Sequence, residues 1–218
     1  MQRFLFEDAA IRGEIVRLNA TWQEVLQRHE YPHAVSTILG QMMAASALLS
    51  AMLKFEGSLT MQIQGKGQLK LAVVECTSER AMRAIAHFDA DVRCDDLLEL
   101  VGPGCLAITI EPKQGRRYQG IVDLTSGDLA KAIEGYMQRS QQLETKIWLT
   151  ADRQQVAGMM LQKLPQQDDI SDSFHEEDVD AWNRISHLAA TVQPQELTDL
   201  AFEELLRRLF FEENLRLF

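Results

Sequence analysis

Histidine and cysteine are the residue types in this chain best suited to metal binding or nucleophilic chemistry, but their spacing gives little support for either. Cys76, Cys94 and Cys105 lie 18 and 11 residues apart and form neither a CxC nor a CxxC pair. Zinc sites usually draw on such pairs, so reduced thiols in a cytoplasm are the favoured interpretation. His175 and His187 are 12 residues apart in an acidic stretch, where solvated side chains are favoured over a metal site. The sequence therefore predicts no metal site in this chain.

Two glycine pairs, in Gly65-Lys66-Gly67 and Gly102-Pro103-Gly104, could in principle cradle a phosphate. A phosphate loop is followed by a helix N-terminus, whereas the residues on either side of both pairs alternate and predict strands. Hairpin turns are therefore the favoured interpretation of both pairs.

No motif typical of a catalytic nucleophile is present, since the chain has no GxSxG stretch. The acidic run at 168–180 also lacks the glycine and the closing glutamate of a calcium loop. A protein that is not an enzyme is therefore predicted. A small-molecule enzyme of α+β fold that uses acids such as Glu75 or Asp123 is an alternative, and it predicts a deep polar pocket.

The elements that must position these residues follow from hydrophobic periodicity. Alternation over short runs predicts strands, which pair into hairpins where a turn separates two runs. Strands are expected at 4–8, 11–18, 59–65, 68–76, 81–90, 105–112, 117–124, 145–152 and 155–164, and helices at 19–29, 32–54 and 128–139. Asn19 and Ser126 are the expected caps of the first and third helices. Antiparallel hairpins with helices segregated from them define an α+β fold.

The second of these helices contains the most apolar run of the chain, Met42 to Leu53. At 12 residues this run is too short to cross a bilayer core about 30 Å thick, and it predicts a buried core helix. Met42, Met43 and Met52 are expected to fill the core rather than form an adaptable binding surface, and Gly40 is expected to allow close packing on a neighbouring element. The first residues lack the apolar stretch of a signal peptide, so a cytoplasmic location and no membrane partner are expected.

The net charge of −10 is concentrated in the last quarter of the chain. Residues 1–164 carry a net charge of −1, and residues 165–218 carry −9. An acidic segment on a nearly neutral body argues against nucleic acid as a partner, because phosphates would be repelled. The change at Pro165 predicts two parts, an α+β core domain at 1–164 and an acidic helical linker at 165–218.

The acidic part combines a polar connector with an amphipathic helix. Residues 166–180 contain seven acids and no base, which is typical of a weakly held connector. Helices are expected at 181–191 and 197–211. Apolar side chains recur in the second helix at i, i+3, i+4, i+7 and i+8 and form one face. This face consists of Phe202, Leu205, Leu206, Leu209 and Phe210.

The residues alone leave the role of this face open. It belongs either to a helix docked permanently on the core or to the switch of a protein-binding chaperone, which uncovers apolar surface when it undocks. A structural protein whose tail binds one specific subunit is a further alternative.

Several stretches of the chain resemble the 33 kDa heat-shock protein family, the redox-regulated bacterial holdases. The resemblance covers nearly the whole chain in order, and YMQRSQQLETKIWL at 136–149 and RYQGIV at 117–122 are its most specific stretches. It implies a chaperone that binds unfolding client proteins without ATP under oxidative stress. Residues 165–218 match the position of the family's linker.

The resemblance also implies parts that this chain does not contain. In the family, a C-terminal module binds zinc through four reduced cysteines in a CxC and a CxxC pair. Oxidation forms two disulfides, releases zinc and the linker, and leads to dimers. None of Cys76, Cys94 and Cys105 corresponds to such a ligand, so no cofactor is expected in this chain and zinc only in the module absent after Phe218. A homodimer is a possible assembly.

Overall fold

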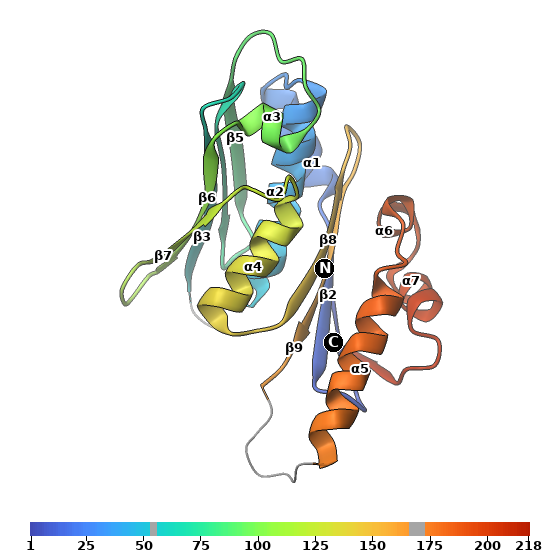
Figure 1. Ribbon diagram of the computed structural model, residues 1–218. Coiled ribbons are helices and arrows are strands. Elements are labelled where there is room, and N and C mark those ends of the chain that lie inside the picture. The colour runs from blue at the N-terminus through green and yellow to red at the C-terminus, as the bar shows by residue number, and fades with distance from the viewer. Residues whose placement is uncertain (53–55, 166–172) are drawn as a thin grey trace.

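The computed structural model of this chain describes residues 1–52, 56–165 and 173–218, with side chains from residue 180 onward in the last range. Two antiparallel five-stranded sheets enclose a long central helix, and the C-terminal helices lie on the far side of one sheet (Figure 1). The strands are β1 (Gln2–Phe6), β2 (Ile11–Arg17), β3 (Gly57–Gly65), β4 (Leu69–Thr77), β5 (Met82–Phe88), β6 (Gly104–Pro112), β7 (Tyr118–Asp123), β8 (Thr145–Ala151), β9 (Val156–Lys163) and β10 (Leu215–Leu217). The helices are α1 (Asn19–Arg28), α2 (His33–Ala51), α3 (Leu97–Val101), α4 (Leu129–Gln141), α5 (Ser173–Ala189), α6 (Pro194–Asp199) and α7 (Phe202–Leu209).

The strand pairing confirms the predicted α+β class. Sheet A has the order β10-β1-β2-β9-β8, and sheet B has the order β5-β4-β3-β6-β7. The predicted hairpins β3-β4 and β6-β7 join into sheet B because β3 pairs with β6 as well as with β4. In sheet A the N-terminal hairpin β1-β2 pairs with β9, which follows much later in the chain.

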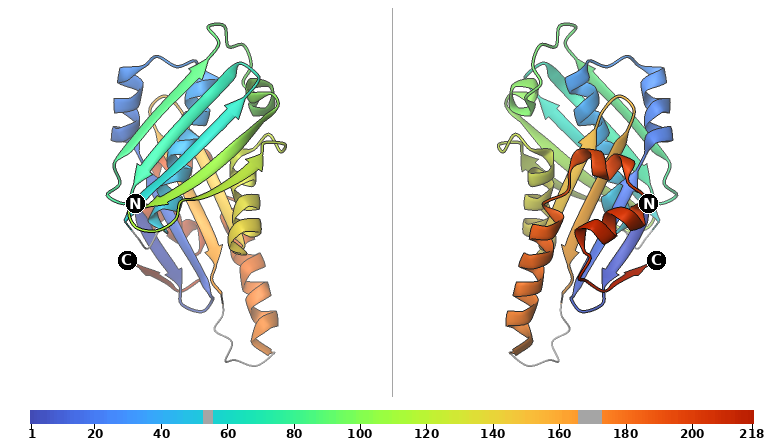
Figure 2. Two further views of the ribbon diagram at one scale, coloured as in Figure 1. Left: turned by 90° about the vertical axis from the view of Figure 1, so that its left-hand side faces the viewer. Right: turned by 90° about the vertical axis from the view of Figure 1, so that its right-hand side faces the viewer.

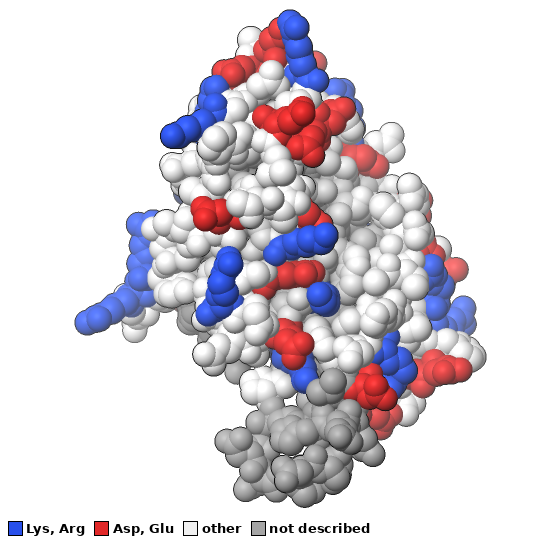
Figure 3. Space-filling view, in the orientation of Figure 1, with Lys and Arg blue, Asp and Glu red and all other residues white. Residues whose placement is uncertain are grey.

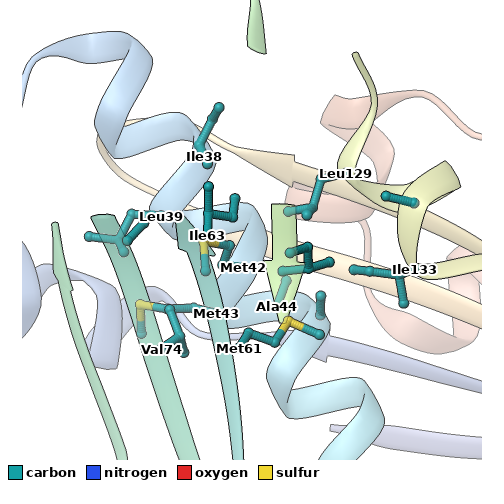
Figure 4. Packing of buried hydrophobic residues seen from close by; sticks show 14 of the residues in the cluster. Ile38, Leu39, Met42, Met43, Ala44, Met61, Ile63, Val74, Leu129 and Ile133 are labelled. Atoms are coloured by element: carbon teal, nitrogen blue, oxygen red, sulfur yellow. The ribbon is translucent and has the colours of Figure 1, made fainter. Parts of the chain in front are cut away.

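Helix α2 forms the core between the two sheets, as the apolar run predicted. It is long and apolar enough to span a membrane, but 83% of its most apolar stretch is buried inside the fold. Met42 and Met43 are fully buried, in one cluster with Ile63 and Val74 of sheet B (Figure 4). A Cβ on Gly40 would lie 2.6 Å from the Ala151 Cβ atom, so the predicted close packing at this glycine is also confirmed.

Two predicted helix caps are wrong by one or two residues. Helix α1 already includes Asn19, and the cap position falls on Leu18 without a side-chain hydrogen bond. Asp128 caps α4, accepting hydrogen bonds from the Ala130 and Lys131 amides at 2.8 and 3.3 Å. The Ser126 hydroxyl instead bonds to the Asp128 backbone. A carboxylate two residues later thus takes the role that the serine was expected to have.

The second glycine pair does not form a hairpin turn. It follows a helix that the sequence did not predict, α3, and Gly102 ends that helix with a φ of 60°. The Gly67 amide donates to the Val101 carbonyl at 2.7 Å, so the two glycine turns pack against each other. A Cβ on Gly67 would lie 2.5 Å from the Leu100 carbonyl oxygen. The turn predicted at Gly65-Lys66-Gly67 is confirmed between β3 and β4.

Candidate functional site

The two faces of sheet A bury different parts of the molecule. One face packs on α2, and the other is covered by the helices that follow residue 173 (Figure 2). Successive residues of a strand point to opposite faces, so β2 turns Val16 to the α2 cluster and Ile15 to the C-terminal helices. The outer face, called the docking face below, consists of Phe4, Phe6, Ile11, Ile15, Ala157, Met159 and Leu161.

The predicted apolar face of the C-terminal segment lies on this docking face. Leu205, Leu206, Leu209 and Phe210 are each no more than 3% exposed. Phe202 is partly buried at the rim of the same cluster. The helical spacing therefore brought these five side chains together as expected. Their partners from α5, α6 and the turn between them, which sequence reasoning did not single out, are Trp182, Ile185, Ala189, Val192 and Leu197.

The helix predicted at 197–211 is two helices. Leu200 and Ala201 adopt extended backbone with ψ of 143° and 148°, which separates α6 from α7. Arg17 of β2 holds this break, because its guanidinium donates to the Leu197 carbonyl at 2.6 Å and also to the Leu200 carbonyl. In a continuous helix these carbonyls would accept hydrogen bonds from backbone N–H groups of the same helix. Here they accept hydrogen bonds from a side chain of the sheet instead. No pattern within 197–211 could have shown this contact.

Phe210 fixes the end of α7 on the sheet through two aromatic contacts. Its ring centroid lies 6.0 Å from that of Phe4 and 5.1 Å from that of Phe6, and the Phe6 contact is edge-to-face. Such geometry is favourable beyond the buried area itself. Gly13 of β2 makes room for the Phe4 ring, since a Cβ there would lie 2.0 Å from the Phe4 Cζ atom.

Hydrogen bonds and ion pairs surround the apolar contact. Arg184 of α5 forms two bonds to the Glu213 carboxylate at 2.8 and 3.1 Å. Arg208 of α7 lies 2.7 Å from the Glu196 carboxylate. The side-chain amide of Gln155, in the β8-β9 turn, donates to the Asp199 carboxylate at 3.1 Å. The interface is therefore apolar at its centre and polar at its edge.

A helix begins within the stretch that was predicted to be an acidic connector. Residues 166–172 lie outside the described residues. Helix α5 begins at Ser173, eight residues before the expected start at Ala181. The stretch 173–180 contains neither proline nor glycine, so nothing in its composition prevents a helix.

The cysteines lie at three separate places in the fold. Cys76 is buried, its thiol lies 3.2 Å from the Ser50 hydroxyl, and burial raises its pKa. The Cys94 thiol donates to the Gln68 side-chain oxygen at 3.2 Å, and Cys105 lies on β6. A raised pKa keeps a thiol protonated at neutral pH, so Cys76 is a poor nucleophile.

One metal-binding pattern was overlooked in the sequence. Residues 29–33 read HEYPH and have the spacing of the HExxH motif. That motif needs one helix to place both imidazoles on the same face. Here α1 ends at Arg28 and α2 begins at His33, with Pro32 between them. Within the described ranges, no group of three or more His, Cys, Asp or Glu side chains could hold a metal ion.

Neither Glu75 nor Asp123, the acids that the enzyme alternative named, lines the main cavities among the described residues. A cavity of about 310 Å³ between the two sheets is mainly apolar, and its wall includes the polar residues Arg12, Gln141 and Gln162. Glu75 accepts a hydrogen bond from Arg83 Nε at 2.6 Å on the outer face of sheet B. Asp123 is exposed on β7, which is separated from β4 by the two strands β3 and β6. The structure therefore does not bring these acids together.

The same layered arrangement occurs in a solved structure. The crystal structure of a 33 kDa chaperonin (heat shock protein 33 homologue) from Thermotoga maritima matches with a TM-score of 0.81. The match covers 100% of this chain and 78% of that chain, at 18% sequence identity. At this identity the likeness establishes the fold.

Sequence comparisons establish the class of protein. The family model described as Hsp33 protein matches residues 1–218. Proteins named 33 kDa chaperonin from Methylobacillus flagellatus and Nitrosococcus oceani are 46% and 48% identical, over 100% of this chain and 73% of their own length. These matches define the chain as a chaperone. It belongs to the Hsp33 family of heat-shock proteins, as the resemblance predicted.

The zinc that the family resemblance implies finds no ligand set among the described residues. The three cysteines lie apart from one another, and the Cys76 and Cys94 thiols contact Ser50 and Gln68. The described residues thus do not fit a bound zinc ion.

Proposed function

We propose that this chain is an ATP-independent holdase, which binds unfolding proteins when the C-terminal helices separate from the docking face. Residues 1–164 would act as the core domain and residues 165–218 as the linker. The observation that carries this proposal is the buried contact between the docking face and the Phe202–Phe210 face. Separation would uncover two matched apolar surfaces at once, and exposed apolar patches of this kind bind non-native proteins.

The forces at this interface favour a conditional contact. The ion pairs Arg184–Glu213 and Arg208–Glu196 include partly exposed side chains, and such pairs contribute about 0–1 kcal/mol each. Burial of apolar side chains must therefore supply most of the attraction. The negative charge of the segment opposes docking through self-repulsion, which salt would screen. A change of a few kcal/mol can shift such an equilibrium.

The acids have a second role in this proposal. Glu203, Glu204 and Glu212 are exposed around α7 and would stay in solvent in either state. Net negative charge keeps protein surfaces soluble. The undocked segment could therefore hold a client in solution rather than aggregate with it.

Redox regulation, as the family resemblance implies it, would act on the linker from outside this chain. We propose that the chain works in the cytoplasm, with unfolded proteins as partners and a homodimer as its assembly. Nucleic acid and membranes are not proposed as partners. On the face seen in Figure 3, acidic and basic side chains lie interspersed, which gives little support for a phosphate-binding surface.

The test is suppression of aggregation. A heat-unfolded client enzyme is mixed with a several-fold excess of this chain, without ATP, in reducing and in oxidising buffer, and light scattering is followed. We expect suppression in both buffers, because no redox sensor is expected within 1–218. Unchanged client aggregation in both buffers would overturn the proposal.

A further inference from the structure

The last strand of the chain occupies one edge of sheet A. β10 pairs with β1 in the register Phe4↔Leu217, Leu5↔Arg216 and Phe6↔Leu215. It spans three residues, and only Leu215 is partly buried in the docking-face cluster. Leu217 is 40% exposed. A short and largely exposed edge strand is among the parts of a fold that open most easily.

The backbone hydrogen bonds between β1 and β10 show which N–H groups of β10 point toward β1. The Glu7 amide donates to the Asn214 carbonyl at 2.9 Å, and the Phe218 amide donates to the Arg3 carbonyl at 3.1 Å. Bonding residues alternate along an antiparallel ladder, so the Arg216 N–H points to β1 and the Leu217 N–H points away. Backbone bonds of this kind do not depend on the side chains of the added strand.

The side chains of the pair explain which strands would fit. Leu215 lies opposite Phe6 and Leu217 opposite Phe4, on the side of the sheet that carries the docking face. The residue between the two leucines, Arg216, is exposed on the other side. The edge therefore accepts an extended segment with apolar residues at alternate positions.

The β1 edge remains in place when β10 leaves. On its other side β1 pairs with β2 from Gln2 to Leu5, and β2 in turn pairs with β9. Loss of β10 would leave the outward N–H and C=O groups of β1 unpaired beside Phe4 and Phe6. Unpaired strand edges attract extended chains.

We propose that this edge of β1 is a strand-addition site for extended segments of client proteins, and that β10 is an internal occupant that a client displaces. The proposal rests on the proposed holdase function and adds a mode of recognition to it. Unfolded segments with alternating apolar residues provide both the backbone groups and the side chains that β10 now supplies.

The experiment uses a fluorescently labelled peptide of residues 212–218, EENLRLF, and the chain of residues 1–218. Arg216→Pro removes the N–H that points to β1, whereas the matched control Leu217→Pro removes one that points away. Fluorescence anisotropy should show at least about tenfold tighter peptide binding to Arg216→Pro than to Leu217→Pro. A peptide N-methylated at Arg216 should lose this binding, and one N-methylated at Leu217 should keep it. Equal affinities within either pair would overturn the proposal.

A disulfide variant keeps the test decisive if Arg216→Pro does not fold. Leu5 and Arg216 lie directly opposite, and such Cα atoms are about 5.5 Å apart, within the range for a disulfide. In a chain with Leu5→Cys and Arg216→Cys, and with Cys94 and Cys105 changed to serine, oxidation closes the edge. The oxidised form should bind the peptide at least about tenfold more weakly than the reduced form. Equal binding would again overturn the proposal.

The aggregation assay separates this proposal from the one on which it rests. The chain could suppress aggregation while the peptide binds neither Arg216→Pro nor the reduced two-cysteine variant. The proposed strand-addition site would then be wrong, and the holdase function would stand. If the peptide binds as expected but no client is protected, the holdase function fails instead.

Discussion

The guanidinium carbon of Arg17 lies 4.5 Å from the centre of the Phe202 ring, and the same side chain donates to the Leu197 carbonyl at 2.6 Å. A cation over an aromatic face is attracted by the ring quadrupole, most strongly where water is excluded. Burial lowers the pKa of Arg17, and the nearby Asp199 carboxylate acts in the opposite direction. One side chain of β2 thus connects the sheet to both α6 and α7.

We expect Arg17→Ala to loosen the C-terminal segment. The change removes two hydrogen bonds to backbone carbonyls and the contact with Phe202, which should weaken docking by about 1–3 kcal/mol. Amide hydrogen exchange at 194–210 should become faster, while exchange in α2 stays slow. Arg207→Ala, at an exposed position on α7, is the matched control. Equal exchange in the two variants would contradict a role of Arg17 in docking.

Two glycine substitutions should change stability in opposite directions. A Cβ on Gly13 would meet the Phe4 ring at 2.0 Å, so Gly13→Ala must displace the ring from Phe6 and Phe210, at about 1–3 kcal/mol. At Gly135 in α4 the nearest atom is a flexible Arg139 nitrogen at 3.7 Å, so Gly135→Ala should stabilise the helix by about 0.5–1 kcal/mol. Urea unfolding measures both. If the Gly13→Ala protein is as stable as the parent, the Phe4 ring can move away from position 13 without loss of stability.

The sequence predicts local features of this fold more fully than contacts between distant segments. Alternation predicted β1 to β9, all the strands of the two sheets except β10, and the i, i+3, i+4 spacing placed Leu205, Leu206 and Leu209 on one buried face. Each of these features depends on residues a few positions apart.

Features that depend on distant contacts were missed. The break at Leu200 and Ala201 is held by Arg17, which lies far away in the chain. β10 is too short to show a period and exists because β1 offers an open edge. Tertiary structure alone therefore determines that β10 pairs at the edge of sheet A and that the C-terminal helices pack on its face.

Stability should depend on pH through Glu14. Its side chain is 3% exposed and lies 3.3 Å from Arg3, and burial raises its pKa above the ordinary 4.5 despite that arginine. The folded state therefore holds this proton more tightly than the unfolded state, and Glu14 contributes less stability as pH rises from 4.5 through its folded pKa. We expect Glu14→Gln to gain stability relative to the parent over that window, by urea unfolding at several pH values. Glu204→Gln, at an exposed position, should show no such trend.

Truncation of Phe210 should favour the client-binding state. Phe210→Ala removes a side chain that is 2% exposed and both of its aromatic contacts, so docking should weaken by about 3–5 kcal/mol. Phe211→Ala is the matched control, because this neighbouring side chain is 81% exposed. If undocking uncovers the client-binding surface, Phe210→Ala should suppress client aggregation at a lower ratio of chaperone to client than the parent, and Phe211→Ala should not. Lower activity of a folded Phe210→Ala protein would instead mean that the docked segment is itself the client-binding form.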